Sequence, residues 1–250
     1  MANADRVAVI TGASSGIGAA LAERLAGDGA SVVLVARRGD LLAQVAARCG
    51  ARALAIPADV TSREAVRDVV ARAIARFGRI DVWVNNAGQG ITRLPSQLTD
   101  DDIDEIMRVN VKSALYGMQE VLPHFKARGT GQIVNVSSML GRTPFAVFRA
   151  AYNGAKHYLN ALTANFRAEV QEQYPGIQVS LVSPGVVRTD FGLNARHGGP
   201  DSRTLPYTQS AEEVAAVIAR VIETRAPDVY TRAGARDQVM AYYDKLGADP

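Results

Sequence analysis

The chain has 250 residues, of which 48% are hydrophobic and 21% are charged, a composition that suits one large globular core. Its 28 basic and 25 acidic residues leave a net charge of only +3, and no run of like charges supports nucleic-acid binding. No stretch of about 18 uninterrupted apolar residues occurs, so no membrane span is expected.

Apolar runs of strand length alternate with segments of helical period along the whole chain. We predict strands at Val7–Thr11, Ser31–Ala36, Ala53–Pro57, Asp81–Asn85, Gln132–Ser137, Gln178–Ser183 and Asp228–Thr231. We predict helices at Gly18–Asp28, Leu41–Cys49, Ser62–Phe77, Thr99–Lys126 (long enough for two consecutive helices), Ala151–Tyr174 and Ala211–Thr224. Near-continuous apolar runs suit strands buried on both faces. The alternation predicts an α/β fold, a doubly wound parallel sheet with helices on both faces.

The first predicted strand runs directly into a glycine-rich turn, Thr11-Gly12-Ala13-Ser14-Ser15-Gly16-Ile17-Gly18. Glycines at such a turn let the backbone bend sharply and approach a pyrophosphate, whose charge is favoured at a helix N-terminus. A glycine-rich turn alone is weak evidence, but its place between the first strand and the first helix makes it a strong indication of cofactor binding. We assign to this cradle Gly12, Ser14, Ser15, Gly16, Ile17 and Gly18.

The end of the second strand bears on the choice of cofactor. NAD-binding folds usually carry an acidic residue about 20 residues past the glycines, whereas this strand ends Val35-Ala36-Arg37-Arg38. A planar guanidinium can bind a 2′-phosphate through paired hydrogen bonds, which a carboxylate would repel. Arg37 is the stronger candidate for this contact and Arg38 the weaker. The pattern therefore favours NADP(H).

Tyr152 and Lys156 lie four residues apart in a predicted helix, so their side chains share one face, roughly 5–6 Å apart at Cβ. A cation there favours the phenolate, so we expect Lys156 to lower a tyrosine pKa that is ordinarily about 10. Such a pair taken alone is more often two partly exposed helix residues. Combined with the phosphate cradle, it predicts a nicotinamide-dependent oxidoreductase.

With these motifs in register, the chain resembles the short-chain dehydrogenase/reductase family in its single-domain form, from about Arg6 to Thr231. The TGxxxGxG pattern is matched by Thr11, Gly12, Gly16 and Gly18, and the YxxxK pattern by Tyr152 and Lys156. Further matches are Asp59-Val60, Asn85-Asn86-Ala87-Gly88, Asn110, Ser138, and Pro184-Gly185 followed by Thr189. The resemblance implies a Rossmann-like fold of about seven strands.

The resemblance also implies a catalytic tetrad of Asn110, Ser138, Tyr152 and Lys156. Tyr152 would be the general acid in reduction or the base in the reverse direction. Ser138 would polarise the substrate oxygen, Lys156 would also bind the nicotinamide ribose, and Asn110 would position a relay water. Further cofactor contacts are expected from Asp59, Val60, Asn86, Ala87, Gly88, Pro184, Gly185 and Thr189.

One departure from the family pattern concerns the substrate side. Thirteen residues separate Ser138 from Tyr152, one more than is usual in the family, which predicts a single-residue bulge within residues 141–150. Residues 190–209 are expected to form a mobile substrate lid. The neighbouring apolar side chains predict a mostly apolar pocket: Phe145, Phe148, Phe191, Leu193 and Tyr207.

We therefore predict an NADP(H)-dependent oxidoreductase that acts on a ketone/secondary alcohol pair, most simply as a carbonyl reductase. Reduction of a C=N or C=C bond on the same scaffold is the nearest alternative. An NADP-binding regulatory protein without catalysis is another, although a pure binder has no need of the complete tetrad.

The remaining expectations concern assembly and location. The three histidines and Cys49, the only cysteine, show no metal-ligand spacing, so we expect no metal. The lone cysteine and the lack of an apolar leader favour a soluble, cytoplasmic protein. We expect one domain over residues 1–250 and a small-molecule substrate. In this family the long helices, here Thr99–Lys126 and Ala151–Tyr174, commonly pair across a two-fold axis, which predicts a homodimer or homotetramer.

Overall fold

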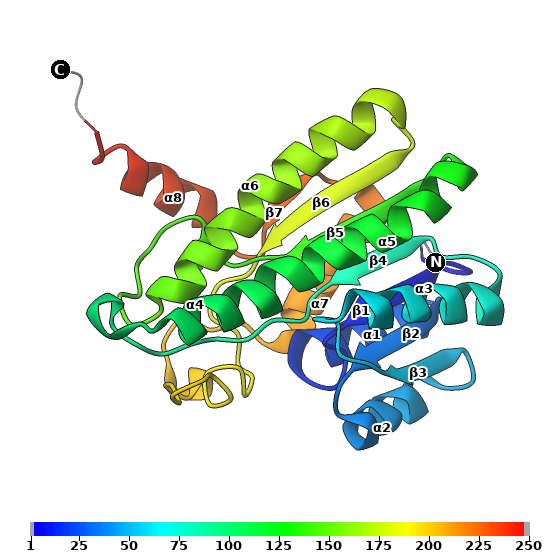
Figure 1. Cartoon of the computed structure of the whole chain (residues 1–250), viewed down its shortest axis with the longest axis horizontal. Helices are drawn as coiled ribbons and strands as arrows, with labels where there is room; N and C mark the ends of the chain where they lie inside the picture. The colour runs from blue at the N-terminus through cyan, green and yellow to red at the C-terminus, as the bar shows by residue number, and fades with distance from the viewer. Residues whose placement is uncertain (1–2, 248–250) are drawn as a thin grey trace.

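The computed structural model, which describes residues 3–247, contains one parallel sheet of seven strands with helices on both faces (Figure 1). The strands are β1 (Val7–Thr11), β2 (Ser31–Ala36), β3 (Ala53–Pro57), β4 (Val82–Asn85), β5 (Gly131–Val136), β6 (Ile177–Ser183) and β7 (Asp228–Tyr230). Their order across the sheet is β3-β2-β1-β4-β5-β6-β7. The helices are α1 (Gly16–Gly27), α2 (Gly39–Cys49), α3 (Arg63–Phe77), α4 (Asp100–Met107), α5 (Ser113–Arg128), α6 (Ala150–Gln173), α7 (Ala211–Thr224) and α8 (Ala235–Tyr243). The predicted fold, strands and helices are confirmed, with ends that agree within two residues.

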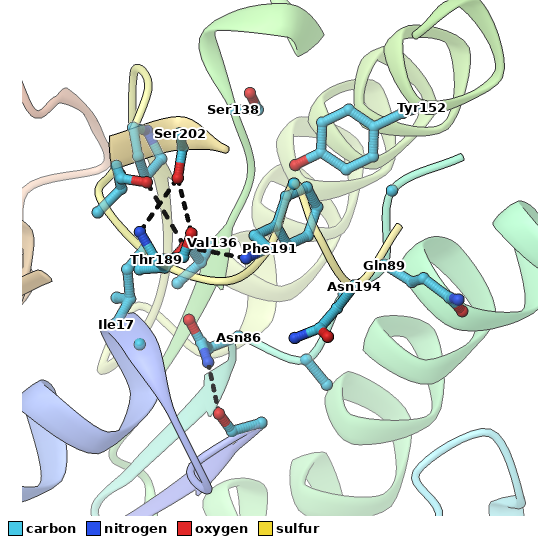
Figure 2. Close-up of a pocket in the computed structure, with 18 of the residues that line it drawn as sticks. Ile17, Asn86, Gln89, Val136, Ser138, Tyr152, Thr189, Phe191, Asn194 and Ser202 are labelled. Atoms are coloured by element: carbon cyan, nitrogen blue, oxygen red, sulfur yellow. Dashed lines mark hydrogen bonds between the residues drawn. The ribbon is translucent and has the colours of Figure 1, made fainter. Parts of the chain in front are cut away.

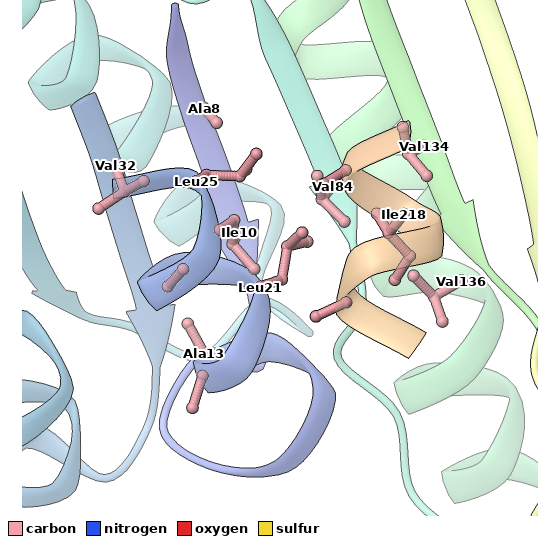
Figure 3. Close-up of a cluster of buried hydrophobic side chains, with 14 of the residues drawn as sticks. Ala8, Ile10, Ala13, Leu21, Leu25, Val32, Val84, Val134, Val136 and Ile218 are labelled. Carbon is pink, nitrogen blue, oxygen red and sulfur yellow. The ribbon is translucent and has the colours of Figure 1, made fainter. Parts of the chain in front are cut away.

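Two apolar layers hold the helices on the sheet, because successive residues of a strand face opposite sides. On one face Ala8 and Ile10 of β1 pack with Leu21 of α1 and Ile218 of α7 (Figure 3). On the other face Val9 packs in the layer formed with α3, α5 and α6. Within residues 3–247, no helix has both the length and the apolar character needed to cross a bilayer.

The predicted segment Thr99–Lys126 folds as two helices joined without a loop. Thr99 caps α4 in a capping box with Asp102, in which each side chain bonds the other residue's backbone N–H. Between α4 and α5, residues Arg108–Lys112 form one π-helical turn. Such turns are rare and often occur at functional sites. Here the turn contains Asn110.

The C-terminal helix α8 was not predicted. It packs against the loop before α6, where the rings of Tyr242 and Phe145 meet edge to face at 5.5 Å. The Tyr243 hydroxyl donates to the carbonyl of Arg142 at 2.8 Å. The helix thereby supports the loop that was expected to shape the substrate side.

Candidate active site

A cavity of about 830 Å³ extends from the glycine-rich turn to the start of α6 and contains most of the predicted site residues (Figure 2). It lies where the strand order reverses between β1 and β4, the usual ligand crevice of a doubly wound sheet. The predicted residues that line it are Gly12, Ser14, Ser15, Gly16, Ile17, Arg37, Arg38, Asp59, Val60, Asn86, Ala87, Gly88, Ser138, Tyr152, Lys156, Pro184, Gly185 and Thr189. Gly18 and Asn110 lie behind this lining.

The glycine-rich turn is packed too closely to accept side chains. Gly12 and Gly16 have φ of +67° and +56°, which favour glycine. A Cβ atom on Gly12 would lie 2.9 Å from Cα of Ala87, and one on Gly18 would lie 2.4 Å from the Gly12 carbonyl oxygen. The Ser15 side chain, at the N-cap of α1, makes no capping hydrogen bond to the first N–H groups of the helix. Because free N–H groups at a helix N-terminus attract anions, the turn fits a pyrophosphate.

The ends of β1 and β4 are joined through the side chains of Thr11 and Asn86. The Thr11 hydroxyl oxygen accepts the N–H groups of Asn86 and Ala87, each at 3.0 Å, and the hydroxyl donates to the Val84 carbonyl at 3.3 Å. In return, Nδ2 of Asn86 donates to the Thr11 carbonyl at 2.9 Å. These bonds fix the floor of the cavity.

Two arginines follow β2 at one end of the cavity. Nη2 of Arg38 donates to the hydroxyls of Ser14 and Ser15, at 3.1 and 2.8 Å, and so spans from β2 to the glycine-rich turn. Arg37 is exposed and makes no side-chain hydrogen bond within residues 3–247. The predicted weaker candidate, Arg38, is therefore the one already fixed beside the cradle.

Asp59 lies beside these arginines. Burial acts to raise the pKa of its carboxyl, but hydrogen bonds from the N–H and hydroxyl of Thr61 and the charges of Arg37 and Arg108 together lower it. The carboxylate is therefore ionised at neutral pH and can accept a hydrogen bond from a ligand.

Ser138, Tyr152 and Lys156 meet at the opposite part of the cavity. Ser138 follows β5, and its hydroxyl oxygen accepts the N–H of Leu140 at 3.1 Å. Tyr152 and Lys156 are 8% and 3% exposed on the first turns of α6. Nζ of Lys156 donates to the Val136 carbonyl at 3.0 Å and lies 5.6 Å from the centre of the Tyr152 ring. Figure 2 shows the Tyr152 hydroxyl directed into the pocket.

The electrostatics of this pair differ from the sequence expectation. Burial raises the pKa of Tyr152 to about 12, and the Ser138 hydroxyl and the Arg149 charge only partly oppose this rise. Burial likewise lowers the pKa of Lys156 to about 8. The expected depression of the tyrosine pKa by Lys156 is therefore wrong for this structure, because burial outweighs the neighbouring charges. Tyr152 keeps its proton at neutral pH.

Asn110 lies outside the cavity lining and fixes the turn after β4 by hydrogen bonds. Its Nδ2 donates to the carbonyls of Gln89 and Ile106 at 2.9 and 3.1 Å, and its Oδ1 accepts the Gln89 N–H at 3.3 Å. A Cβ atom on Gly88 would lie 2.9 Å from Oδ1 of Asn110. Asn110 thus positions the backbone that lines the cavity, and the relay water assigned to it stays a prediction.

The substrate side is only partly as expected. Phe145, Phe148 and Phe191 line the cavity, and the rings of Phe191 and Tyr152 lie 5.5 Å apart. Leu193 and Tyr207 do not line it and are 45% and 81% exposed, so their assignment was wrong. Their place in the loop after β6 does not bring them to the cavity.

Several lining residues were missed. Arg149, the residue before α6, is buried beside the tyrosine, although its position in a loop gave no sign of this. Asn194 and Leu205 lie in the expected lid, and Gln238 lies on the unpredicted α8.

The lid residues 190–209 lie over this end of the cavity. The Arg196 N–H donates to the Gly90 carbonyl at 2.9 Å, and the Thr92 N–H donates to the Arg196 carbonyl at 3.0 Å. His197 contacts the buried carboxylate of Asp102 at 2.8 Å. These contacts attach the segment to the start of α4 and to the chain after β4.

Comparison with known proteins agrees with this geometry. Residues 6–198 match the family model described as short chain dehydrogenase. An uncharacterized oxidoreductase of Staphylococcus epidermidis is 36% identical over 197 residues, which cover 75% of this chain and 83% of the relative.

Two solved structures are similar over nearly their whole length. The 3-ketoacyl-(acyl-carrier-protein) reductase of Brucella melitensis, complexed with NADH, is 28% identical with a TM-score of 0.80, over 92% of this chain and 98% of that one. The alcohol dehydrogenase of the archaeon Thermococcus sibiricus, complexed with 5-hydroxy-NADP, is 28% identical with a TM-score of 0.78, over 90% and 95%. The chain therefore belongs to the short-chain dehydrogenase/reductase family of oxidoreductases.

Proposed function

We propose that the protein is an NADP(H)-dependent carbonyl reductase that interconverts a ketone and a secondary alcohol. The observation that carries the proposal is the meeting of Ser138, Tyr152 and Lys156 in the cavity that begins at the phosphate cradle. Bound nicotinamide cofactor would supply the hydride in reduction and accept it in the reverse direction. The glycine-rich turn lines one end of the cavity and the catalytic residues line the other, which supports a dinucleotide bound at the first end and the substrate at the second.

The protein's own residues supply the proton chemistry. With a pKa of about 12, the Tyr152 hydroxyl is protonated at neutral pH and can donate to an oxygen that becomes alkoxide. The Ser138 hydroxyl lies in the same cavity and can hold that oxygen. Lys156, fixed by the Val136 carbonyl, places a cation beside the tyrosine ring. These groups together favour negative charge on the reacting oxygen.

The preference for NADP(H) rests on the end of β2. Arg37 and Arg38 both line the cavity, and no carboxylate occupies the position of Ala36. Arg38 already donates to Ser14 and Ser15, so its guanidinium is positioned without a ligand. Two cations here favour a 2′-phosphate over a free 2′-hydroxyl. One of the two similar structures is complexed with NADH and the other with 5-hydroxy-NADP, so they do not favour either cofactor. The proposed preference therefore depends on the residues at the end of β2.

We also propose that the protein is a homodimer or homotetramer assembled through α5 and α6. The support is a hollow of about 390 Å³ between these helices, lined by apolar side chains. Apolar members of this lining are Leu115, Leu122, Pro123, Leu162 and Phe166. A second copy placing its own α5 and α6 there would remove this apolar surface from water.

The first prediction concerns the proton donor. Tyr152→Phe removes only the hydroxyl, so turnover of a ketone with NADPH should fall about 10²–10⁴-fold while NADPH affinity stays nearly unchanged. The matched control is Tyr158→Phe, which changes an exposed tyrosine of the same helix and should leave turnover intact. Near-normal turnover of Tyr152→Phe in steady-state assays would remove the proposed mechanism.

The second prediction concerns Lys156. Its pKa is lowered from 10.5 to about 8, so the buried ammonium destabilises the fold by about 3 kcal/mol below pH 8. As pH rises from about 8 to 10.5, the folded protein loses this proton before the unfolded chain does. Wild-type stability should therefore rise by about 3 kcal/mol relative to Lys156→Met over that window.

Urea unfolding at a series of pH values measures this difference. The control is Lys112→Met, which removes an exposed lysine but keeps Lys156, so its stability should rise with pH as that of the wild type does. If the difference in the free energy of unfolding between wild type and Lys156→Met stays constant with pH, burial of Lys156 does not destabilise the fold.

The third prediction concerns cofactor choice. Arg37→Ala and Arg38→Ala should each raise the KM for NADPH by roughly 10–100-fold and hardly change that for NADH, because a charge-assisted hydrogen bond contributes about 1.5–3 kcal/mol. Adding Ala36→Asp to Arg37→Ala should reverse the preference through repulsion. Arg72→Ala, an exposed arginine of α3, controls for net charge. Equal kcat/KM of the wild type with both cofactors would contradict the proposal.

The fourth prediction concerns assembly. Light scattering at micromolar concentration should give the mass of a dimer or tetramer. Leu122→Glu, which puts a charge into the hollow between α5 and α6, should shift the mass toward that of one chain. A strict monomer for the wild type would contradict this assembly.

A further inference from the structure

Arg149 is a buried cation without a partner. The residue is 6% exposed, and its side chain takes part in no hydrogen bond or ion pair within residues 3–247. Its Nη1 is enclosed with no acceptor. The ring of Phe148 lies 5.9 Å from the guanidinium carbon and can offset little of the charge. Burial lowers the pKa of Arg149, yet an arginine stays protonated at neutral pH.

The surrounding backbone makes room for this guanidinium. A Cβ atom on Gly90 would lie 2.3 Å from Nη1, and one on Gly199 would lie 2.6 Å from Nη2. The same position on Gly199 is 3.0 Å from the Thr92 hydroxyl oxygen, which is also enclosed without a partner. Two unsatisfied polar groups therefore border one glycine of the lid.

The acidic residues of the cavity do not neutralise Arg149. Asp59 is bonded to Thr61, and Asp190 pairs with Arg203 at 3.3 Å. A buried cation with no counter-charge costs several kcal/mol, so its retention in a binding cavity indicates a ligand that supplies the charge. Arg149 lines the same cavity as Tyr152, and its charge acts on the tyrosine pKa.

We propose that Arg149 binds a carboxylate of the substrate, so that the enzyme acts on an oxo acid and the corresponding hydroxy acid. This inference rests on the proposed carbonyl reduction. One guanidinium matches one carboxylate in both charge and paired hydrogen-bond geometry. The two arginines of the lid, Arg196 and Arg203, are already paired with Asp102 and Asp201, and the further cation of the cavity lining, Arg232, comes from the chain after β7.

The apolar lining of the substrate side suits the carbon chain of a substrate between its carbonyl and its carboxylate. Phe145, Phe148, Phe191 and Leu205 line the cavity around Arg149 and Tyr152. An aliphatic segment fits these side chains, with the carbonyl at the tyrosine and the carboxylate at the arginine. The substrate class is therefore an aliphatic oxo acid.

The test compares acids with their neutral esters. The probes are levulinate and its longer straight-chain homologues, each measured against its own methyl ester with NADPH. Because a charge-assisted pair is lost in the ester, wild-type kcat/KM should favour the acid by about 10–100-fold for the chain length that fits. Arg149→Met should lower the kcat/KM for the acid to that for the ester and leave the kcat/KM for the ester unchanged. Arg149→Lys should retain part of the preference for the acid. Arg220→Met, an exposed arginine of α7, is the control for net charge.

Two results would overturn the inference. Equal kcat/KM for acid and ester in the wild type would show that no carboxylate is recognised. An equal loss for both in folded Arg149→Met would show that Arg149 only braces the lid. Should Arg149→Met not fold, Arg149→Gln replaces it in the same comparison.

A binding measurement separates failure of this inference from failure of the proposed function. If neither acids nor esters are turned over, the proposed function fails. Calorimetric titration of the NADP⁺-saturated protein with hexanoate, and with hexan-1-ol as the neutral control, then decides. Binding of hexanoate by the wild type but not by Arg149→Met supports the carboxylate site, and equal binding of hexanoate by both proteins, or none by either, overturns it.

Discussion

The hydrogen-bonded joint between the ends of β1 and β4, formed by Thr11 and Asn86, is the interaction on which the site depends. The strand order reverses between these strands, so the chain diverges there and leaves a crevice at their carboxyl ends. The hydrogen bonds between Thr11 and Asn86 fix the two ends relative to each other, and Gly12 and Gly18 pack into the joint with no space for side chains. Since Asn110 holds the next residues of the same turn, the phosphate cradle and the catalytic side share one rigid floor.

Burial is the second constraint, and it acts on three ionisable groups of the catalytic side. It raises the pKa of Tyr152 and lowers those of Lys156 and Arg149, in each case toward the neutral form. The lysine is partly compensated by the Val136 carbonyl, whereas the arginine has no such acceptor. The fold therefore gives up stability to keep two cations around one tyrosine, as expected where electrostatic preorganisation serves chemistry.

The sequence was most informative where the determinants are local. Long apolar runs and capping residues predicted the strands and helices, and the cradle from Thr11 to Gly18 is one contiguous segment. The polar helix α8 forms through contacts with the distant loop at Phe145, which no local pattern records. The burial of Arg149 depends on Gly90 and Gly199, far apart in sequence. The pKa of Tyr152 was misjudged for the same reason, because spacing gives a neighbour but not the degree of burial.

The cations at the two ends of the cavity act in different ways. Arg37 and Arg38 are exposed, so water and salt screen them, and under the proposed function they would select the cofactor without much influence on the chemistry. Arg149 is buried, and its charge partly opposes the burial that raises the pKa of Tyr152. A substrate carboxylate on Arg149 would cancel this effect and let the tyrosine hold its proton more firmly. Because Tyr152 is already protonated at neutral pH, under the proposed function a bound oxo acid would leave it a more weakly acidic proton donor than a neutral ketone would.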